Sequence, residues 1–235
     1  MQQTRIRSGK GGHTPGSVAD AKRGSDAMTL KGPMPVADVA PSSNHVGRLI
    51  LAPRDAEVCP DRDRLVRILS EAGFIADRIP DRECAYLVGP EFSALLAFVG
   101  CAVAIESDPR TGGPFCHVVV PPASVNPRWC HGRNTRAPRC PGCRARLSDW
   151  PLRVEQFEVS ASMPGADRQE TAVDCPTCGE ARPIRSWDWK RQGGFARLLI
   201  QVEEIFPGEA VPTEGFLRLL ERATGCAWRY FYVQD

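Results

Sequence analysis

The sequence lacks the long apolar runs that mark membrane-spanning and secreted proteins. Its longest nearly apolar run, residues 92–105, is too short to cross a bilayer and is interrupted by a glycine. The N-terminal stretch contains no apolar core of the kind that a secretory signal needs. The formal net charge is only +2, which by itself favours neither a nucleic-acid binder nor an acidic tail. We therefore expect a cytoplasmic protein that contacts no membrane.

The common catalytic motifs are absent as well. The sequence contains no GxSxG, no HExxH and no complete P-loop. Of the four histidines, His13 and His45 lie in a Gly- and Pro-rich N-terminal segment, and His117 alternates within a strand-like run as a core or edge residue does. An enzyme of unidentified class stays an alternative, but these absences count against catalysis.

Residues 1–45 are rich in Gly, Pro, Ser and Ala and show little hydrophobic periodicity. Such a segment cannot bury enough apolar surface to offset the entropy that it loses on ordering. We therefore predict that residues 1–45 are a disordered tail. The remaining chain is long enough for one domain with a generous core or for two small ones.

The hydrophobic pattern of residues 46–122 predicts strands that alternate with short helices. One helix has Asp61 as its N-cap and Gly73 as its stop, and a second helix is predicted over residues 90–100. Strands are expected in four runs: residues 46–53, 84–89, 101–107 and 114–122. This alternation is typical of a compact α/β unit.

Residues 190–235 form the second part of the predicted core. A helix begins after Thr213 and ends at Gly225, and a strand is expected on each side of it. Because one helix and two strands are marginal alone, this block should complete the core that residues 46–122 begin. The predicted fold class is therefore α+β, with a mixed α/β core and short helices.

Residues 123–189 have a different texture, because prolines, arginines and cysteines crowd together and no helical pattern is visible. Residues 151–162 alternate imperfectly and are predicted as a bulged strand, with residues 169–175 as its partner. We interpret the whole segment as an insert in the core.

Ten cysteines are many for a reducing compartment, where paired cysteines bind metal more often than they form structural disulfides. Two pairs follow the pattern Cys-Pro-X-Cys: Cys140 with Cys143, and Cys175 with Cys178. A two-residue spacing lets one tight turn aim both sulfurs at a single ion, and two such turns complete a tetrahedral shell for one structural zinc. Iron of the rubredoxin type uses the same four ligands and stays an alternative. A redox couple is disfavoured, because no helix pattern follows Cys143.

The runs CPGC and CPTCG resemble the paired knuckles of zinc-ribbon proteins, over residues 140–179 only. This resemblance implies an inserted zinc-ribbon-like β lobe, built from small hairpins around a four-cysteine zinc, and says little about function. The first knuckle departs from the pattern, because Arg144 stands where glycine is common. The run GRNTRAPRCPGCRARL, together with PFCHVVV, is also similar to bacterial proteins of uncharacterised function.

The other six cysteines are expected to be less informative. Cys84, Cys101, Cys116 and Cys226 lie in apolar or strand-like runs and are interpreted as small buried hydrophobes, while Cys59 is isolated. Cys130 and His131 shortly precede the first knuckle, so they are candidates for a replacement ligand or for a second site.

Arginines and tryptophans gather around the knuckles, which suggests a surface for nucleic acid or another polyanion. The candidate residues are Arg128, Trp129, Arg133, Arg136, Arg139, Arg144, Arg146, Trp187, Trp189, Lys190 and Arg191. The leading hypothesis is nevertheless a structural or protein-interaction protein. In this hypothesis zinc holds together a Pro- and Arg-rich stretch whose apolar content is too low for it to fold alone, and the main partner is another protein.

Overall fold

The computed structural model describes residues 47–99, 105–162 and 172–235. The tail predicted for residues 1–45 and most of the strand predicted for residues 101–107 lie outside these ranges. Among the helices of the described ranges, none is both long and apolar enough to cross a membrane.

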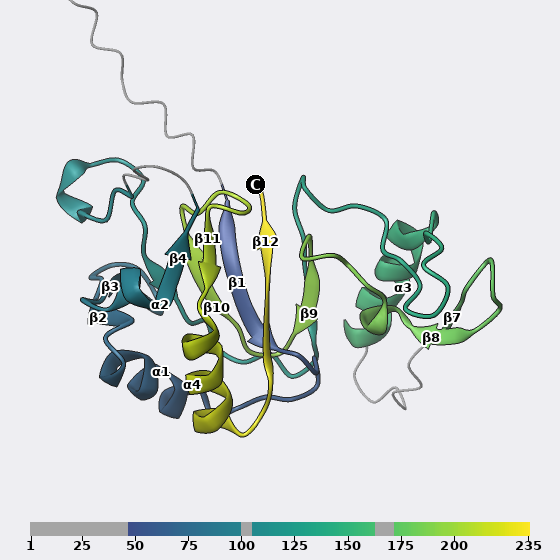
Figure 1. The fold of residues 1–235 in the computed structure, drawn as a ribbon, viewed down its shortest axis with the longest axis horizontal. Coiled ribbons are helices and arrows are strands. Elements are labelled where there is room, and N and C mark those ends of the chain that lie inside the picture. The colour runs from purple at the N-terminus through teal and green to yellow at the C-terminus, as the bar shows by residue number, and fades with distance from the viewer. Residues whose placement is uncertain (1–46, 100–104, 163–171) are drawn as a thin grey trace, which may run out of the picture. The chain divides into compact units, whose positions relative to one another are not determined.

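The largest element is a six-stranded antiparallel sheet with the order β12-β1-β10-β5-β3-β2 (Figure 1). Its strands are β1 (Arg48–Pro53), β2 (Ile75–Arg78), β3 (Ala85–Val88), β5 (Val118–Val119), β10 (Ile200–Glu203) and β12 (Trp228–Val233). Strand β1 lies between β10 and β12, with Leu49 opposite Val202 on one side and Tyr232 on the other. The first and last described strands therefore belong to the same sheet.

Two capped helices accompany this sheet, α1 (Arg62–Glu71) and α4 (Glu214–Thr224). The Asp61 carboxylate accepts a hydrogen bond from the Arg64 amide, and the Thr213 hydroxyl accepts one from the Phe216 amide. The αL conformation of Gly225 ends α4, as the sequence predicts. Both caps were recognisable because they depend on residues only three apart.

The two faces of β1 enter different apolar clusters. Leu49 and Leu51 pack with apolar residues of α1 and α4, among them Leu65 and Phe216, in the largest cluster among the described residues. The alternate residue Ile50 joins a smaller cluster on the opposite face. Because side chains alternate along a strand, α1 and α4 share one face of the sheet, and Figure 1 shows the two helices close together.

The helix predicted over residues 90–100 is shorter in the structure. Only Phe92–Leu95 are helical (α2), and the chain continues directly as β4 (Leu96–Phe98). Strand β4 pairs with β11 (Ala210–Pro212), and this pairing extends the backbone from Leu96 onward. Apolar residues in so short a run satisfy both helical and strand spacing, so the sequence alone does not separate the two.

The prediction of a strand over residues 151–162 is wrong, because this segment forms helix α3 (Trp150–Ser162). Pro151 occupies the first turn of the helix, where its missing N–H costs nothing. Trp150, Val154 and Phe157 recur at helical spacing and face the interior. Strand β7 (Ala172–Asp174) consequently pairs with β8 (Ala181–Pro183) instead of with this segment.

Two further strands, β6 (Arg128–Cys130) and β9 (Gly194–Ala196), pair antiparallel and join the two ends of the cysteine-bearing segment. We call residues 128–196 the lobe. It contains α3, the β7–β8 hairpin and both Cys-Pro-X-Cys pairs. The mixed α+β class predicted from the sequence is thus observed, and the boundaries predicted for the insert stay a prediction.

Candidate metal centre

The two Cys-Pro-X-Cys pairs adopt the same backbone turn, which we call the first and the second knuckle. In the first knuckle, the Cys140 N–H donates to the carbonyl of Ala145 (2.8 Å) and the Arg144 N–H donates to the carbonyl of Cys140 (3.0 Å). In the second, the Cys175 N–H donates to Glu180 (3.0 Å) and the Gly179 N–H donates to Cys175 (2.9 Å). Each knuckle therefore offers two sulfurs from one tight turn.

The four sulfurs meet at one point. The Sγ atoms of Cys140, Cys143, Cys175 and Cys178 all lie within 4.8 Å of one another, with Cys143 3.5 Å from Cys175 and Cys140 3.9 Å from Cys178. A tetrahedral zinc with bonds of about 2.3 Å to sulfur spaces its ligands about 3.8 Å apart. A disulfide would require about 2 Å, and all four cysteines are free. The four thiols can hold a metal ion.

The centre lies at the surface of the lobe. Cys140 and Cys175 are buried, whereas Cys143 and Cys178 are exposed. Each knuckle therefore directs its first sulfur toward the interior of the lobe and its second toward solvent. This arrangement anchors the cluster on one side and leaves the other side open for an ion to enter.

The neighbouring groups change the acidity of the thiols. The backbone N–H groups of Cys178 and Thr177 lower the pKa of the Cys175 thiol to about 6. The Glu180 N–H also acts to lower the pKa of Cys178, but the neighbouring thiols of Cys175 and Cys143 outweigh it and raise that pKa to about 12. Four thiolates at this spacing repel one another, and a divalent cation among them would remove the repulsion.

An aromatic cluster supports the buried side of the centre. Its buried members are Ala56, Trp129, Cys140, Leu147, Val154, Val173, Cys175, Ile184, Trp187, Trp189 and Phe195. The ring centroids of Trp129 lie 4.4 Å from Trp189 and 4.5 Å from Phe195. The scattered tryptophans of this stretch thus converge on one cluster, whereas the expectation that the stretch cannot fold alone stays a prediction. Two of the four thiols belong to the packing itself.

The candidate site at Cys130 and His131 is separate from the four thiols. Cys130 packs beside Ile50 and Phe231 in the cluster behind β1, and its burial raises the pKa of its thiol to about 11. The His131 ring stacks on Trp129 at a centroid distance of 5.7 Å. Within the part of the chain that the structure describes, the four-cysteine group is the one that can hold a metal through three or more such ligands.

The candidate nucleic-acid residues divide into two groups. Trp129, Trp187 and Trp189 are buried in the aromatic cluster, so their ring faces are not open to bases. Most of the predicted cations are exposed: Arg128, Arg133, Arg136, Arg144, Arg146, Lys190 and Arg191, while Arg139 is half-buried. The sequence did not single out Asp188, whose carboxylate lies 2.7 Å from the Arg144 guanidinium.

The pKa of Asp188 is lowered from its ordinary value. Burial acts in the opposite direction, but the Lys190 amide and the Arg144 side chain both donate to the carboxylate and outweigh it. Asp188 is therefore a charged acceptor among cations. Only a tertiary contact reveals this role, because Arg144 and Asp188 belong to distant parts of the sequence.

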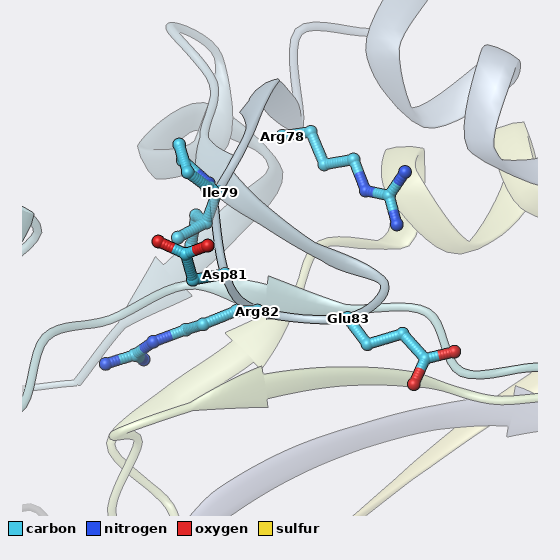
Figure 2. A pocket seen from close by; sticks show the side chains of 6 residues that line it. Arg78, Ile79, Asp81, Arg82 and Glu83 are labelled. Carbon is cyan, nitrogen blue, oxygen red and sulfur yellow. The ribbon is translucent and has the colours of Figure 1, made fainter.

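Outside the lobe, a hollow of about 430 Å³ follows β2 and is lined by residues 78–83. Figure 2 shows the charged ends of Arg82 and Glu83 pointing in opposite directions, so they do not converge on one point. Arg82 contacts His117 Nε2 at 3.3 Å, and His117 Nδ1 lies 2.8 Å from the Phe115 carbonyl. Burial lowers the pKa of His117. This histidine is a neutral, packed side chain, and the hollow does not have the geometry of an acid–base pair.

No protein-family model, curated protein or solved structure matches this chain. The convergence of the four thiols is therefore the strongest functional observation on the molecule.

Proposed function

We propose that Cys140, Cys143, Cys175 and Cys178 bind one zinc ion and that the protein is a structural or interaction protein whose lobe this ion organises. The observation that carries the proposal is the spacing of the four sulfurs, all within 4.8 Å of one another. The donor set supports it, because four thiolates are the ligands of structural zinc sites.

A structural role suits this site better than a catalytic one. Four thiolates fill the tetrahedral shell and leave no position for water or substrate. His131, a candidate base of the lobe, stacks on the buried ring of Trp129. Neither knuckle begins a helix, since α3 starts only at Trp150, so a helix terminus of the kind that activates redox thiols is missing here.

The energetic reason for a metal lies in the chain path. The two knuckles are separated by α3, and the β7–β8 hairpin carries the second knuckle at its turn. A metal that ligates both knuckles links this hairpin to the first knuckle, although the two are far apart in the sequence. Structural zinc contributes about 10 kcal/mol or more to such small units, which is comparable to the stability of a whole domain.

The proposal is tested by measuring metal content in purified full-length protein by elemental analysis. One zinc per chain is expected for the wild type, and the double variant Cys175→Ser, Cys178→Ser should lose it. The matched control Cys59→Ser, Cys226→Ser should keep it, because both residues pack beside the sheet core. Zinc-free wild-type protein, or a fully loaded knuckle variant, would overturn the proposal. Iron–thiolate absorbance in the visible range would keep the ligands and replace the metal.

The protein-interaction role and its nucleic-acid alternative are both uses of the lobe's surface once the ion has ordered it. Neither follows from the thiols themselves. The distribution of charge on the lobe, in contrast, favours one kind of partner over the other.

A further inference from the structure

Three extended segments of the lobe run side by side next to the first knuckle. Arg139 pairs with Arg146 on one side and with Asp188 on the other, in two antiparallel bridges. The Arg139 and Asp188 backbones exchange both hydrogen bonds, each at 2.9 Å. Side chains of directly paired residues lie on the same face, so these three side chains form one row.

The opposite face of these segments enters the aromatic cluster. Pro138 and Cys140 flank Arg139 and are buried, and Trp187 and Trp189 flank Asp188 and are also buried. This alternation fixes the orientation of the row. Arg146, Arg139 and Asp188 therefore face outward, away from the aromatic cluster.

The single carboxylate of this row has two donors from basic residues. Arg144 forms an ion pair with Asp188, and the Lys190 backbone N–H donates to the same carboxylate at 2.9 Å. We call the surface formed by Arg139, Arg144, Arg146, Asp188 and Lys190 the ribbon face. Two arginines that are direct cross-strand neighbours repel each other. The ribbon face contains four cationic residues and one carboxylate, so its formal charge is positive.

The backbone at two of these cations is unusual. Arg144 has φ 66° and Lys190 has φ 51°, and the next residue, Arg191, has φ 62°. Left-handed conformations favour glycine and cost a non-glycine residue about 1 kcal/mol or more. The corresponding position of the second knuckle is indeed Gly179, with φ 70°. The first knuckle therefore carries a cation where a glycine would be less strained.

We propose that the ribbon face binds the phosphate backbone of a nucleic acid. Arginine's planar guanidinium matches phosphate oxygens in a bidentate way, and arginines supply three of the four cations. The tryptophans beneath are buried, so base stacking on them is not available and the contact is independent of sequence. An anionic membrane fits less well, because the ribbon face includes none of the exposed large apolar residues of the described ranges: Val99, Val125, Leu152, Val159 and Phe206. The inference rests on the proposed zinc centre, since the ion holds the first knuckle in place.

A second role for these cations has to be separated from the first. Four thiolates with one zinc carry a net negative charge, and nearby arginines also serve to balance it. If balance were their sole role, removing them would weaken zinc binding and would leave nucleic acid unbound throughout. Charge balance therefore predicts that removing the cations weakens zinc binding, whereas phosphate binding predicts that it weakens nucleic-acid binding.

The test uses full-length, zinc-loaded protein and a fluorescein-labelled single-stranded DNA of random sequence, about 20 nucleotides long, followed by anisotropy over a range of salt. The variant Arg139→Gln, Arg146→Gln, Lys190→Gln removes three cations and leaves the Arg144–Asp188 pair intact. The matched control Arg64→Gln, Arg67→Gln, Arg222→Gln removes three exposed cations from α1 and α4. Zinc content is measured on every sample.

Wild type and control should bind the DNA in the micromolar range at low salt, whereas the ribbon-face variant should bind at least tenfold more weakly. The slope of log affinity against log salt should become less steep by about 2, because the variant makes fewer phosphate contacts and so releases fewer counterions on binding. Equal weakening in both triple variants, or loaded wild type that does not bind, would overturn the inference and leave the zinc proposal standing. So would tighter binding to poly-glutamate or to anionic vesicles, which would assign the face to an acidic protein or to lipid. Wild type without zinc would instead defeat the proposed function.

Discussion

The six-stranded sheet and the lobe are stabilised by different means. The sheet is covered by capped helices and buries an extensive aliphatic and aromatic cluster, with Leu49, Leu51 and Phe216 fully buried. The lobe has one smaller cluster in which two of the four thiols are themselves core residues. A segment with a small apolar cluster can therefore still form a defined site when its large rings and its ligands pack together.

The largest expected effect is the response of the two regions to metal removal. Chelation should loosen the lobe first, because its knuckles lose their common ligand, while the sheet keeps its apolar core. Proteases should then cut between about residues 125 and 185 before they cut elsewhere, and hydrogen exchange should remain slow in β1.

Strand β12 provides an internal control for this experiment. Its outer edge is bonded to the lobe, since the Tyr232 N–H donates to the Arg191 carbonyl (3.0 Å) and the Gln234 N–H donates to Asn134 Oδ1 (2.9 Å). These two amides should lose protection on chelation, whereas the amide of Phe231, which faces β1, should keep it. Uniform loss of protection over the whole sheet would show that the lobe and the sheet unfold as one unit.

A core substitution should produce the second-largest effect, now in the sheet. Phe216 of α4 is fully buried, and its ring centroid lies 4.5 Å from that of Phe74. Phe216→Ala should lower the free energy of unfolding by about 3–5 kcal/mol, because it removes a large side chain and leaves a cavity. Chemical denaturation measures this change, and zinc content in the folded state should stay at the wild-type level. Loss of zinc from folded Phe216→Ala protein would contradict the distinction between the two regions.

The sequence predicted the sheet better than the lobe, for a physical reason. Helices α1 and α4 were found because their caps and apolar faces are local, and the four thiols were found because a two-residue spacing determines a knuckle. Helix α3 is not predicted, since the apolar residues of this segment, Val154 and Phe157 among them, alternate imperfectly with polar ones as in a bulged strand. The row Arg146–Arg139–Asp188 depends on single-residue bridges between distant segments, which no local pattern records.

The smallest expected effects compare the two knuckles with each other. Gly179 has φ 70°, and a Cβ at this position would meet no atom within 4 Å. Gly179→Ala should therefore lower stability through backbone strain alone, by about 1 kcal/mol. Arg144→Gly relieves the same strain in the first knuckle but loses an exposed ion pair with Asp188, which contributes at most about 1 kcal/mol.

The two substitutions should thus differ in direction, because one adds left-handed strain and the other removes it. Thermal unfolding of the zinc-loaded lobe, followed by the fluorescence of its buried tryptophans, should show a lower midpoint for Gly179→Ala. For Arg144→Gly the midpoint should be unchanged or slightly higher. The same Arg144→Gly protein should bind the labelled DNA more weakly than wild type, because it lacks one cation of the ribbon face. If Gly179→Ala leaves the thermal midpoint unchanged, left-handed strain does not account for the difference between the two knuckles. A lower midpoint for Arg144→Gly would show that the ion pair with Asp188 outweighs the strain, so that Arg144 stabilises the first knuckle as well as charging its surface.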